Sequence, residues 1–181
     1  MMTVPASRSY FMETARLGFG QWTSDDLSMA LGLWGDPAVT KLIGGPFSED
    51  QVSTRLDNEI ISQELDGFQY WPIFEKISGE HIGAAGLRWR SRAENTCELG
   101  YYLKRCAWGQ GYAAEAGQAV VRYSFEVLNF NGLFAGHHPE NAASGIVLEK
   151  LGFVFTHTEL FAPTGLHHPS YLLPPPSRGS T

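Results

Sequence analysis

Hydrophobic and polar residues alternate with a period of two in the middle of this chain, which is typical of half-buried β-strands. The alternating runs are 68–77, 81–89 and 96–103, and the short turns 78–80 and 91–95 separate them. Strand-like runs joined by short polar turns predict an antiparallel meander. Trp71-Pro72 predicts an edge or a bulge in the first run, because proline has no N–H to donate to a neighbouring strand.

Apolar residues recur with helical spacing in four other segments, which begin near residues 24, 49, 113 and 141. Ser48 with Gln51 three positions later forms a capping box, and Gly152 provides a stop for the last helix. We expect four helical faces to be buried, namely Leu27, Ala30, Leu31 and Trp34; Val52, Leu56, Ile60 and Leu65; Ala113, Ala116, Gly117, Val120, Val121, Ser124 and Leu128; and Ile146, Val147, Leu148 and Leu151.

The order of these elements predicts the fold class. A strand at 16–22 precedes the helical pair, the meander follows, and residues 96–103, 113–128 and 133–137 read as strand, helix and strand. A helix between two neighbouring strands implies a parallel pair. A final hairpin covers 153–161 and 166–173. We therefore expect an α/β protein with a mixed, mostly antiparallel sheet and helices on both faces.

At 181 residues, the chain predicts a single domain. We expect it at 13–173, after a loose leader at 1–12 and before a flexible proline-rich tail at 174–181. The helical pair between residues 23 and 67 either covers a substrate cleft or shields one sheet edge, and the pattern alone favours the shielding of the edge.

Composition narrows the class of protein. The chain is 43% hydrophobic and 18% charged with a formal net charge of −6, which indicates a globular protein without a basic nucleic-acid or membrane-binding surface. Cys97 and Cys106 do not make a disulfide framework or a structural zinc set. Residues 1–9 lack the apolar core of a signal peptide, and no apolar run is long enough to span a bilayer. We expect a cytoplasmic protein with no nucleic-acid or membrane partner.

The segment 108–114, Trp-Gly-Gln-Gly-Tyr-Ala-Ala, follows a strand and opens a helix. Free backbone N–H groups and the helix dipole make such a turn a site for an anion such as a pyrophosphate. A Rossmann site needs a third glycine and an acidic residue after the next strand, where this chain has 136–138, Gly-His-His. A Walker loop needs Gly-Lys-Ser/Thr, which is also absent.

Four segments in order and spacing resemble one family. They are 13–17 (Glu-Thr-Ala-Arg-Leu), 79–83 (Gly-Glu-His-Ile-Gly), 98–116 around the glycine turn, and 139–153, from Pro-Glu-Asn-Ala-Ala-Ser to Leu-Gly-Phe. The sequence resembles the GNAT acetyltransferases, in particular the ribosomal-protein N-terminal acetyltransferases of the RimJ/RimL type. The resemblance covers about residues 14–173, nearly the whole chain.

The resemblance implies acetyl-CoA as co-substrate and no metal. In the family the glycine turn holds the pyrophosphate through its backbone, and the pantetheine arm lies between two splayed parallel strands. Trp108 stands where the family pattern has Arg or Gln, which leaves main-chain donors in place. The cofactor-binding residues that it implies are Tyr101, Tyr102, Leu103, Trp108, Gly109, Gln110, Gly111, Tyr112, Ala113, Ala114, Asn141 and Ser144.

The resemblance also implies catalytic roles. Ser144 matches a serine that faces the CoA sulfur, so it is the candidate proton donor to the thiolate. Glu98 is the candidate base, with His138 as its main rival and His137 and Glu140 as further options. Alternatives remain: Asn141 can be a plain helix cap, and Ser144 can bond to backbone.

The pairs at 137–138 and 167–168 bring four histidines to the chain's second half. Adjacent strand residues point to opposite faces, so each pair offers one ligand per face, and we expect no metal site.

The predicted reaction is acetyl transfer from acetyl-CoA to a primary amine: a protein N-terminus, an amino-acid-like amine or a polyamine. The alternative is a non-catalytic acyl-CoA-binding sensor of the same fold. Either a monomer or a homodimer is compatible with exposed strand edges.

Overall fold

A single eight-stranded sheet organises the computed structural model, which describes residues 8–177. The strand order is β1-β2-β3-β4-β5-β6-β8-β7, and only β5 and β6 pair in parallel. The strands are β1 (Met12–Glu13), β2 (Leu17–Phe19), β3 (Tyr70–Glu75), β4 (His81–Ser91), β5 (Thr96–Leu103), β6 (Gly132–Gly136), β7 (Val154–Phe161) and β8 (Leu166–Leu173). The predicted fold class, the β3–β4–β5 meander and the final hairpin are confirmed.

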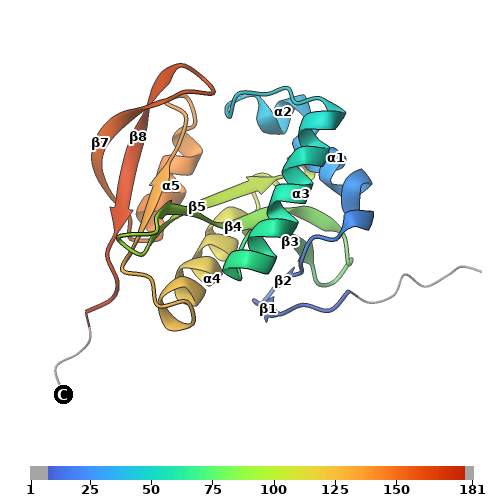
Figure 1. Ribbon diagram of the computed structural model, residues 1–181, viewed down its shortest axis with the longest axis horizontal. Helices are drawn as coiled ribbons and strands as arrows, with labels where there is room; N and C mark the ends of the chain where they lie inside the picture. Colours follow the sequence, from blue (N-terminus) through green and yellow to red (C-terminus); the bar gives the residue numbers. More distant parts are fainter. Residues whose placement is uncertain (1–7, 178–181) are drawn as a thin grey trace, which may run out of the picture.

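Five α-helices cover the two faces of the sheet (Figure 1). They are α1 (Leu27–Trp34), α2 (Pro37–Thr40), α3 (Glu49–Asp66), α4 (Tyr112–Glu126) and α5 (Ala142–Lys150), with short 3₁₀ turns at 24–26 and 105–107. The predicted capping box is present: the Ser48 hydroxyl accepts from the Gln51 N–H, and the Gln51 side chain accepts from the Ser48 N–H. None of the helices in the described range is long and apolar enough to cross a membrane.

Two hydrophobic clusters lie on opposite faces of the sheet. One contains Leu99 of β5 with Ala116 and Val120 of α4 and Leu148 of α5. The other joins α1 and α3 to the sheet through residues such as Trp34. Because successive strand residues alternate between faces, Tyr101 of β5 faces α4 and α5 whereas Tyr102 faces α1 and α3.

The parallel pair separates after its first half. Thr96, Cys97 and Glu98 of β5 pair with Gly132, Leu133 and Phe134 of β6, and the pairing ends there. From Leu99 to Leu103, β5 pairs with β4 alone. The resemblance predicted this splayed arrangement, which leaves one side of the second half of β5 open to a ligand.

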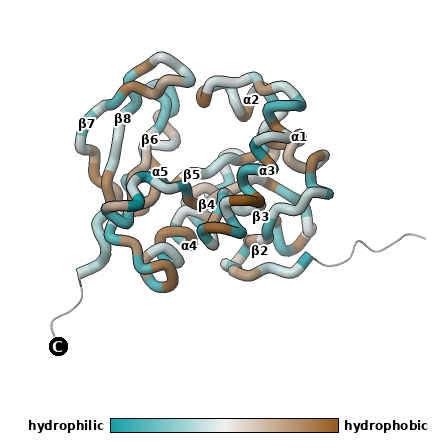
Figure 2. Tube along the Cα trace, viewed as in Figure 1, coloured by the Kyte–Doolittle hydropathy of each residue, from teal (hydrophilic) through white to brown (hydrophobic). Residues whose placement is uncertain are grey.

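The predicted helical faces needed two corrections. Leu65 of α3 is 77% exposed, whereas Glu59 is buried. Each helical residue advances about 100°, so Leu65 lies about 180° from Leu56 while Glu59 lies within about 20° of Val52. Ile146 of α5 is likewise 55% exposed, because it lies about 200° from the buried Leu148. The prediction placed Leu65 and Ile146 in the buried faces because they are apolar, and it did not take their angular position on the helix into account. In Figure 2, hydrophilic and hydrophobic residues alternate along α3.

The ends of the chain lie partly outside the described residues, which exclude 1–7 and 178–181. Of the predicted leader, residues 8–12 are tied to the domain: Arg8 forms an ion pair with Asp26 at 2.6 Å, and its guanidinium lies 5.0 Å from the centre of the Phe74 ring. Met12 pairs with Phe19 as the start of β1. Residues 174–177 have no regular secondary structure.

Candidate active site

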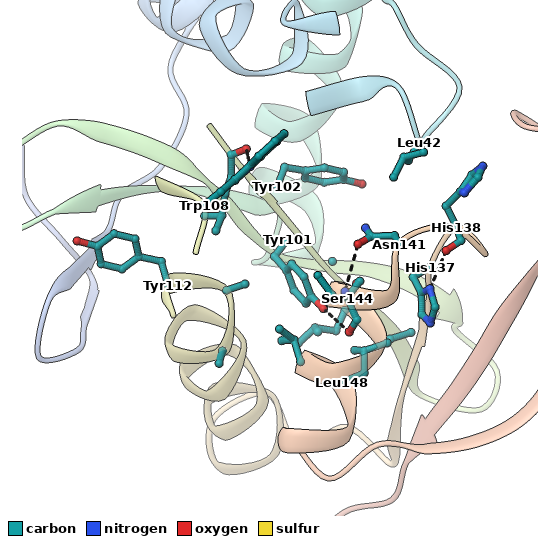
Figure 3. A pocket seen from close by; sticks show the side chains of 18 of the residues that line it. Leu42, Tyr101, Tyr102, Trp108, Tyr112, His137, His138, Asn141, Ser144 and Leu148 are labelled. Atoms are coloured by element: carbon teal, nitrogen blue, oxygen red, sulfur yellow. Dashed lines mark hydrogen bonds between the residues drawn. The ribbon is translucent and has the colours of Figure 1, made fainter. Parts of the chain in front are cut away.

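A pocket of about 580 Å³ lies where β5 and β6 separate (Figure 3). It runs from the glycine turn at 109–114, along β5, to the start of α5, and its far end is lined by apolar residues of α2 and the loop after it. All the residues expected to bind the cofactor line this one pocket, except Gln110. They are Tyr101, Tyr102, Leu103, Trp108, Gly109, Gly111, Tyr112, Ala113, Ala114, Asn141 and Ser144. Glu98, His137 and His138 line it as well.

Ser144 and Tyr101 face each other across the pocket wall (Figure 3). The Ser144 Oγ lies 2.9 Å from the Tyr101 Oη, which also donates to the Ser144 carbonyl at 3.2 Å. The Asn141 Oδ1 accepts from the Ser144 N–H at 3.2 Å, so Asn141 is a helix cap that also lines the pocket. Burial raises the pKa of Tyr101 to about 12, and therefore the phenol stays protonated at neutral pH. The Tyr101 hydroxyl was not predicted as a functional group.

Glu98 is the last β5 residue that pairs with β6, and it lies directly opposite Arg88 of β4. It shares the α1 and α3 face with Tyr102, because the two are four residues apart on one strand. Burial raises the pKa of Glu98 above its ordinary value, while the charges of Arg88 and Arg90 act in the opposite direction. The carboxylate thus lies on the face opposite to Ser144, at the point where the strands separate.

The histidines at the end of β6 are engaged in hydrogen bonds. The Glu140 N–H donates to the His138 Nδ1 at 3.1 Å, so the neutral ring carries its proton on Nε2 and has no free lone pair. The His137 Nδ1 donates to the His138 carbonyl at 2.8 Å, and its Nε2 lies 3.3 Å from the Tyr171 hydroxyl. Glu140 has a side chain that is 80% exposed. This geometry favours Glu98 over its rivals as the base.

The four candidate imidazoles do not gather at one point. His138 packs edge to face against His168 at 5.4 Å between ring centres, and the His168 Nε2 lies 2.8 Å from the Thr164 hydroxyl. Within residues 8–177, no group of three or more metal-ligating side chains is found.

The glycine turn presents backbone donors to the pocket. Gly109 and Gly111 have φ values of +72° and +80°, a region that side chains other than glycine rarely adopt. Over residues 109–114, no N–H group has an acceptor among the described residues. These groups include the first N–H groups of α4, which have no partner within the helix. The turn therefore presents a set of backbone donors at the positive end of a helix, which suits an anion.

The side chains of the turn point to protein partners. The Trp108 Nε1 donates to the Leu103 carbonyl at 2.9 Å, and the Gln110 Nε2 donates to the Cys106 carbonyl at 2.7 Å. The Tyr112 hydroxyl donates to Glu75 at 2.6 Å. The polar side-chain groups of these three residues are therefore engaged with the protein, and a ligand at the turn would contact their backbone. The indole ring of Trp108 is half exposed and is a further surface for contact.

The fold is a mixed α/β sheet whose parallel strands β5 and β6 separate to form this pocket. Residues 16–154 match the family model described as the acetyltransferase (GNAT) domain. The chain belongs to the GNAT acetyltransferase family and is an N-acetyltransferase, as the motifs predicted.

Relatives and solved structures agree with this assignment. The N-acetyltransferase p20 of Bacillus licheniformis is 32% identical over 142 residues, 77% of this chain and 80% of that protein. The FsC-acetyl coenzyme A-N(2)-transacetylase of Aspergillus fumigatus is 33% identical over 172 residues, 88% and 70% of the two chains. The structure of RimL, a ribosomal L7/L12 acetyltransferase, in complex with coenzyme A has a TM-score of 0.79 at 15% identity, over 92% of this chain and 98% of RimL. At that identity, the last likeness concerns the fold.

The resemblance to the ribosomal-protein branch is also confirmed. The [Ribosomal protein uS5]-alanine N-acetyltransferase of Escherichia coli is 32% identical over 85 residues, 46% of this chain and 44% of that protein.

Proposed function

We propose that the pocket binds acetyl-CoA, with the diphosphate on the backbone of the 109–114 turn and the pantetheine arm along the open side of β5. The observation that carries this proposal is the loss of pairing between β5 and β6 after Glu98, which opens the pocket between the glycine turn and Ser144. An extended pantetheine arm then has as partners those backbone groups of residues 99–103 that pair neither with β4 nor with Trp108. GNAT relatives with coenzyme A bound support the choice of ligand.

The reaction is the direct attack of a primary amine on the thioester. The amine nitrogen forms a bond to the carbonyl carbon, and the carbon–sulfur bond then breaks to release the CoA thiolate. The attacking nitrogen loses one proton, which Glu98 accepts directly or through a water. The raised pKa of Glu98 suits this task, because a more basic carboxylate takes a proton more readily near neutral pH.

The leaving thiolate needs a proton. In this proposal Ser144 donates its hydroxyl proton to the sulfur, and Tyr101, whose hydroxyl lies 2.9 Å from that of Ser144, replaces it. The proton lost by the amine and the proton gained by the thiolate therefore pass through opposite faces of the sheet, since Glu98 faces α1 and α3 while Tyr101 faces α5.

The acceptor amine enters on the side of α2 and the final hairpin. Leu42 and His138 both line this end of the pocket (Figure 3). The loops beyond them meet, because a Cβ on Gly44 would lie 2.9 Å from the Pro163 Cβ. Apolar residues of α2 and one carboxylate, Glu98, suit a primary amine with an apolar neighbour. Named substrates of relatives range from a ribosomal protein to FsC, so both a protein N-terminus and a small molecule are candidate acceptors.

A thiol-release assay with acetyl-CoA and a panel of amines tests the proposal. The panel contains α-amino acids, polyamines, aromatic amines and peptides with Ala or Ser at the N-terminus. We expect stoichiometric release of CoA with at least one amine. Binding of acetyl-CoA with no turnover on any amine would support the alternative of a non-catalytic acyl-CoA sensor, and an absence of binding would exclude both functions.

A further inference from the structure

Three carbonyl groups around the glycine turn are each held by a side-chain donor. Trp108 holds the Leu103 carbonyl, and Gln110 holds the Cys106 carbonyl. The third donor comes from far away in the sequence: the Arg16 Nη1 donates to the Gln110 carbonyl at 2.9 Å, from the residue just before β2.

The third bond fixes the orientation of one peptide group. In a trans peptide, the C=O of one residue and the N–H of the next point in opposite directions. Because the Gln110 carbonyl points to Arg16, the Gly111 N–H must point away from Arg16. This N–H has no acceptor among residues 8–177, and Gly111 lines the pocket. Arg16 therefore determines the direction of a donor at the centre of the anion site.

Arg16 is itself held in one place. Its Nε donates to Glu115 Oε2 at 2.6 Å, and its backbone N–H donates to Glu115 Oε1 at 2.9 Å. The Thr14 hydroxyl donates to the same carboxylate at 2.5 Å. The guanidinium carbon lies 4.3 Å from the centre of the Tyr112 ring, so the group also makes a cation–π contact with that ring. The segment before β2 and the first turn of α4 thus form one hydrogen-bonded unit.

Glu115 places a negative charge in the first turn of the helix that would receive the diphosphate. Although burial acts to raise it, the hydrogen bonds from Thr14 and Arg16 hold the pKa of Glu115 below its ordinary value, so the carboxylate is ionised at neutral pH. The Arg16 guanidinium neutralises this charge at 2.6 Å. An anion at the turn then meets backbone donors beside a neutral ion pair.

We propose that Arg16 is a positioning residue for the cofactor diphosphate, which acts through the Gln110–Gly111 peptide and through Glu115. This inference rests on the proposed binding of acetyl-CoA. The turn is thus held without the Arg or Gln of the family pattern at position 108: the Trp108 indole N–H holds the Leu103 carbonyl, and the Arg16 guanidinium, from the segment before β2, holds the Gln110 carbonyl.

The test compares two ligands that differ in the diphosphate. Coenzyme A carries it, whereas pantetheine has the same thiol arm without it. We measure dissociation constants for both by NMR titration with wild-type protein and Arg16→Met. Loss of one hydrogen bond of this kind predicts a dissociation constant for coenzyme A at least about tenfold higher, with that for pantetheine unchanged. A merely structural role for Arg16 would weaken both ligands equally, and that outcome would overturn the proposal.

A second variant separates positioning from simple charge attraction. Glu115→Gln removes a negative charge beside the site, so charge attraction alone predicts tighter binding of coenzyme A. Positioning predicts weaker binding, because Arg16 loses its ionic partner and its hold on Gln110. Tighter binding by Glu115→Gln would therefore contradict the proposal even if Arg16→Met does not fold.

The matched control is Arg92→Met. It removes a guanidinium that pairs with Asp66 at 2.9 Å, outside both the pocket and the segment before β2, and we expect unchanged affinity for both ligands. If wild-type protein binds coenzyme A and Arg16→Met binds it equally well, only the role of Arg16 fails. If wild-type protein binds no coenzyme A, the proposed function fails with it.

Discussion

The hydroxyl of Tyr101 lies 2.9 Å from the hydroxyl of Ser144, although the two residues are 43 positions apart and belong to different elements, β5 and α5. The distance allows a proton to pass from the phenol to the serine as the serine gives its own proton to a leaving sulfur. The Tyr101 hydroxyl keeps its proton at neutral pH, because burial raises its pKa to about 12, and either hydroxyl can be the donor in this contact. A serine alone at the start of a helix lacks such a proton source.

Ser144→Ala therefore is expected to lower kcat by on the order of 10²-fold, with the KM for acetyl-CoA nearly unchanged. Tyr101→Phe keeps the ring and removes the hydroxyl, and we expect a smaller loss of about tenfold. Because the two groups act in one relay, the double variant should be no slower than Ser144→Ala by more than about twofold. Steady-state thiol release checks all three, and additive losses would show that the two hydroxyls act independently.

Glu98→Gln is expected to lower kcat/KM by about 10²-fold or more at neutral pH. As the base, Glu98 must be deprotonated, so the wild-type rate should fall as pH decreases through its pKa, which burial raises above the ordinary value. The variant should lose that acid limb and recover part of its rate at high pH, where more of the amine is already neutral. A pH–rate profile of both proteins gives the answer: the only remaining limb in Glu98→Gln should be the one set by ionisation of the amine, and a limb that stays at the wild-type position would exclude Glu98.

His138→Gln is expected to retain most of the activity, because the His138 Nδ1 already accepts from the Glu140 N–H. The glutamine carbonyl can accept the same bond, and the variant therefore keeps the turn before α5. Thiol release at saturating acetyl-CoA is the measurement. A loss as large as that of Glu98→Gln would transfer the role of base to the histidine.

His81 is expected to make the protein sensitive to acid. Its ring packs between Trp22 and Phe74, and neither ring nitrogen has a hydrogen-bond partner among the described residues. Burial, with the nearby charge of Lys104, lowers its pKa from 6.5 to about 3. Below pH 6.5 His81 binds a proton in the unfolded chain but stays neutral in the folded protein. The free energy of unfolding therefore decreases as pH falls toward 3, by up to about 1.4 kcal/mol per pH unit.

His81→Phe removes this titration and keeps an aromatic ring in the same place. Urea unfolding of both proteins between pH 7 and pH 4 measures the slope. The variant should lose less stability than the wild type over this range. Equal slopes would show that His81 is not a buried neutral group in the folded protein.

The sequence was sufficient to predict most of the residues that line the pocket, because the glycine turn and the start of α5 are local motifs. The glycine turn, Asn141 and Ser144 each belong to a short motif whose spacing fixes the geometry. The Tyr101 hydroxyl needed the sheet: the face that a strand residue occupies, and its distance from α5, depend on register. The contact from Arg16 to the Gln110 carbonyl spans 94 positions, and no local sequence pattern predicts it. Conversely, the burial of Glu59 and the exposure of Leu65 were within reach of helical angles alone.

The most direct test of the central claim is the dissociation constant of acetyl-CoA for three proteins, measured by isothermal titration calorimetry: wild type, Gly111→Glu and Gly67→Glu. Both glycines have a φ of +80°, so the two substitutions carry a similar backbone strain, but Gly67 ends α3, away from the pocket. A glutamate at 111 fills the anion site and adds a negative charge to it. We expect Gly67→Glu to bind like the wild type and a folded Gly111→Glu to bind at least about 10²-fold more weakly. Equal affinity of Gly111→Glu and Gly67→Glu would contradict the assignment of the glycine turn to the diphosphate.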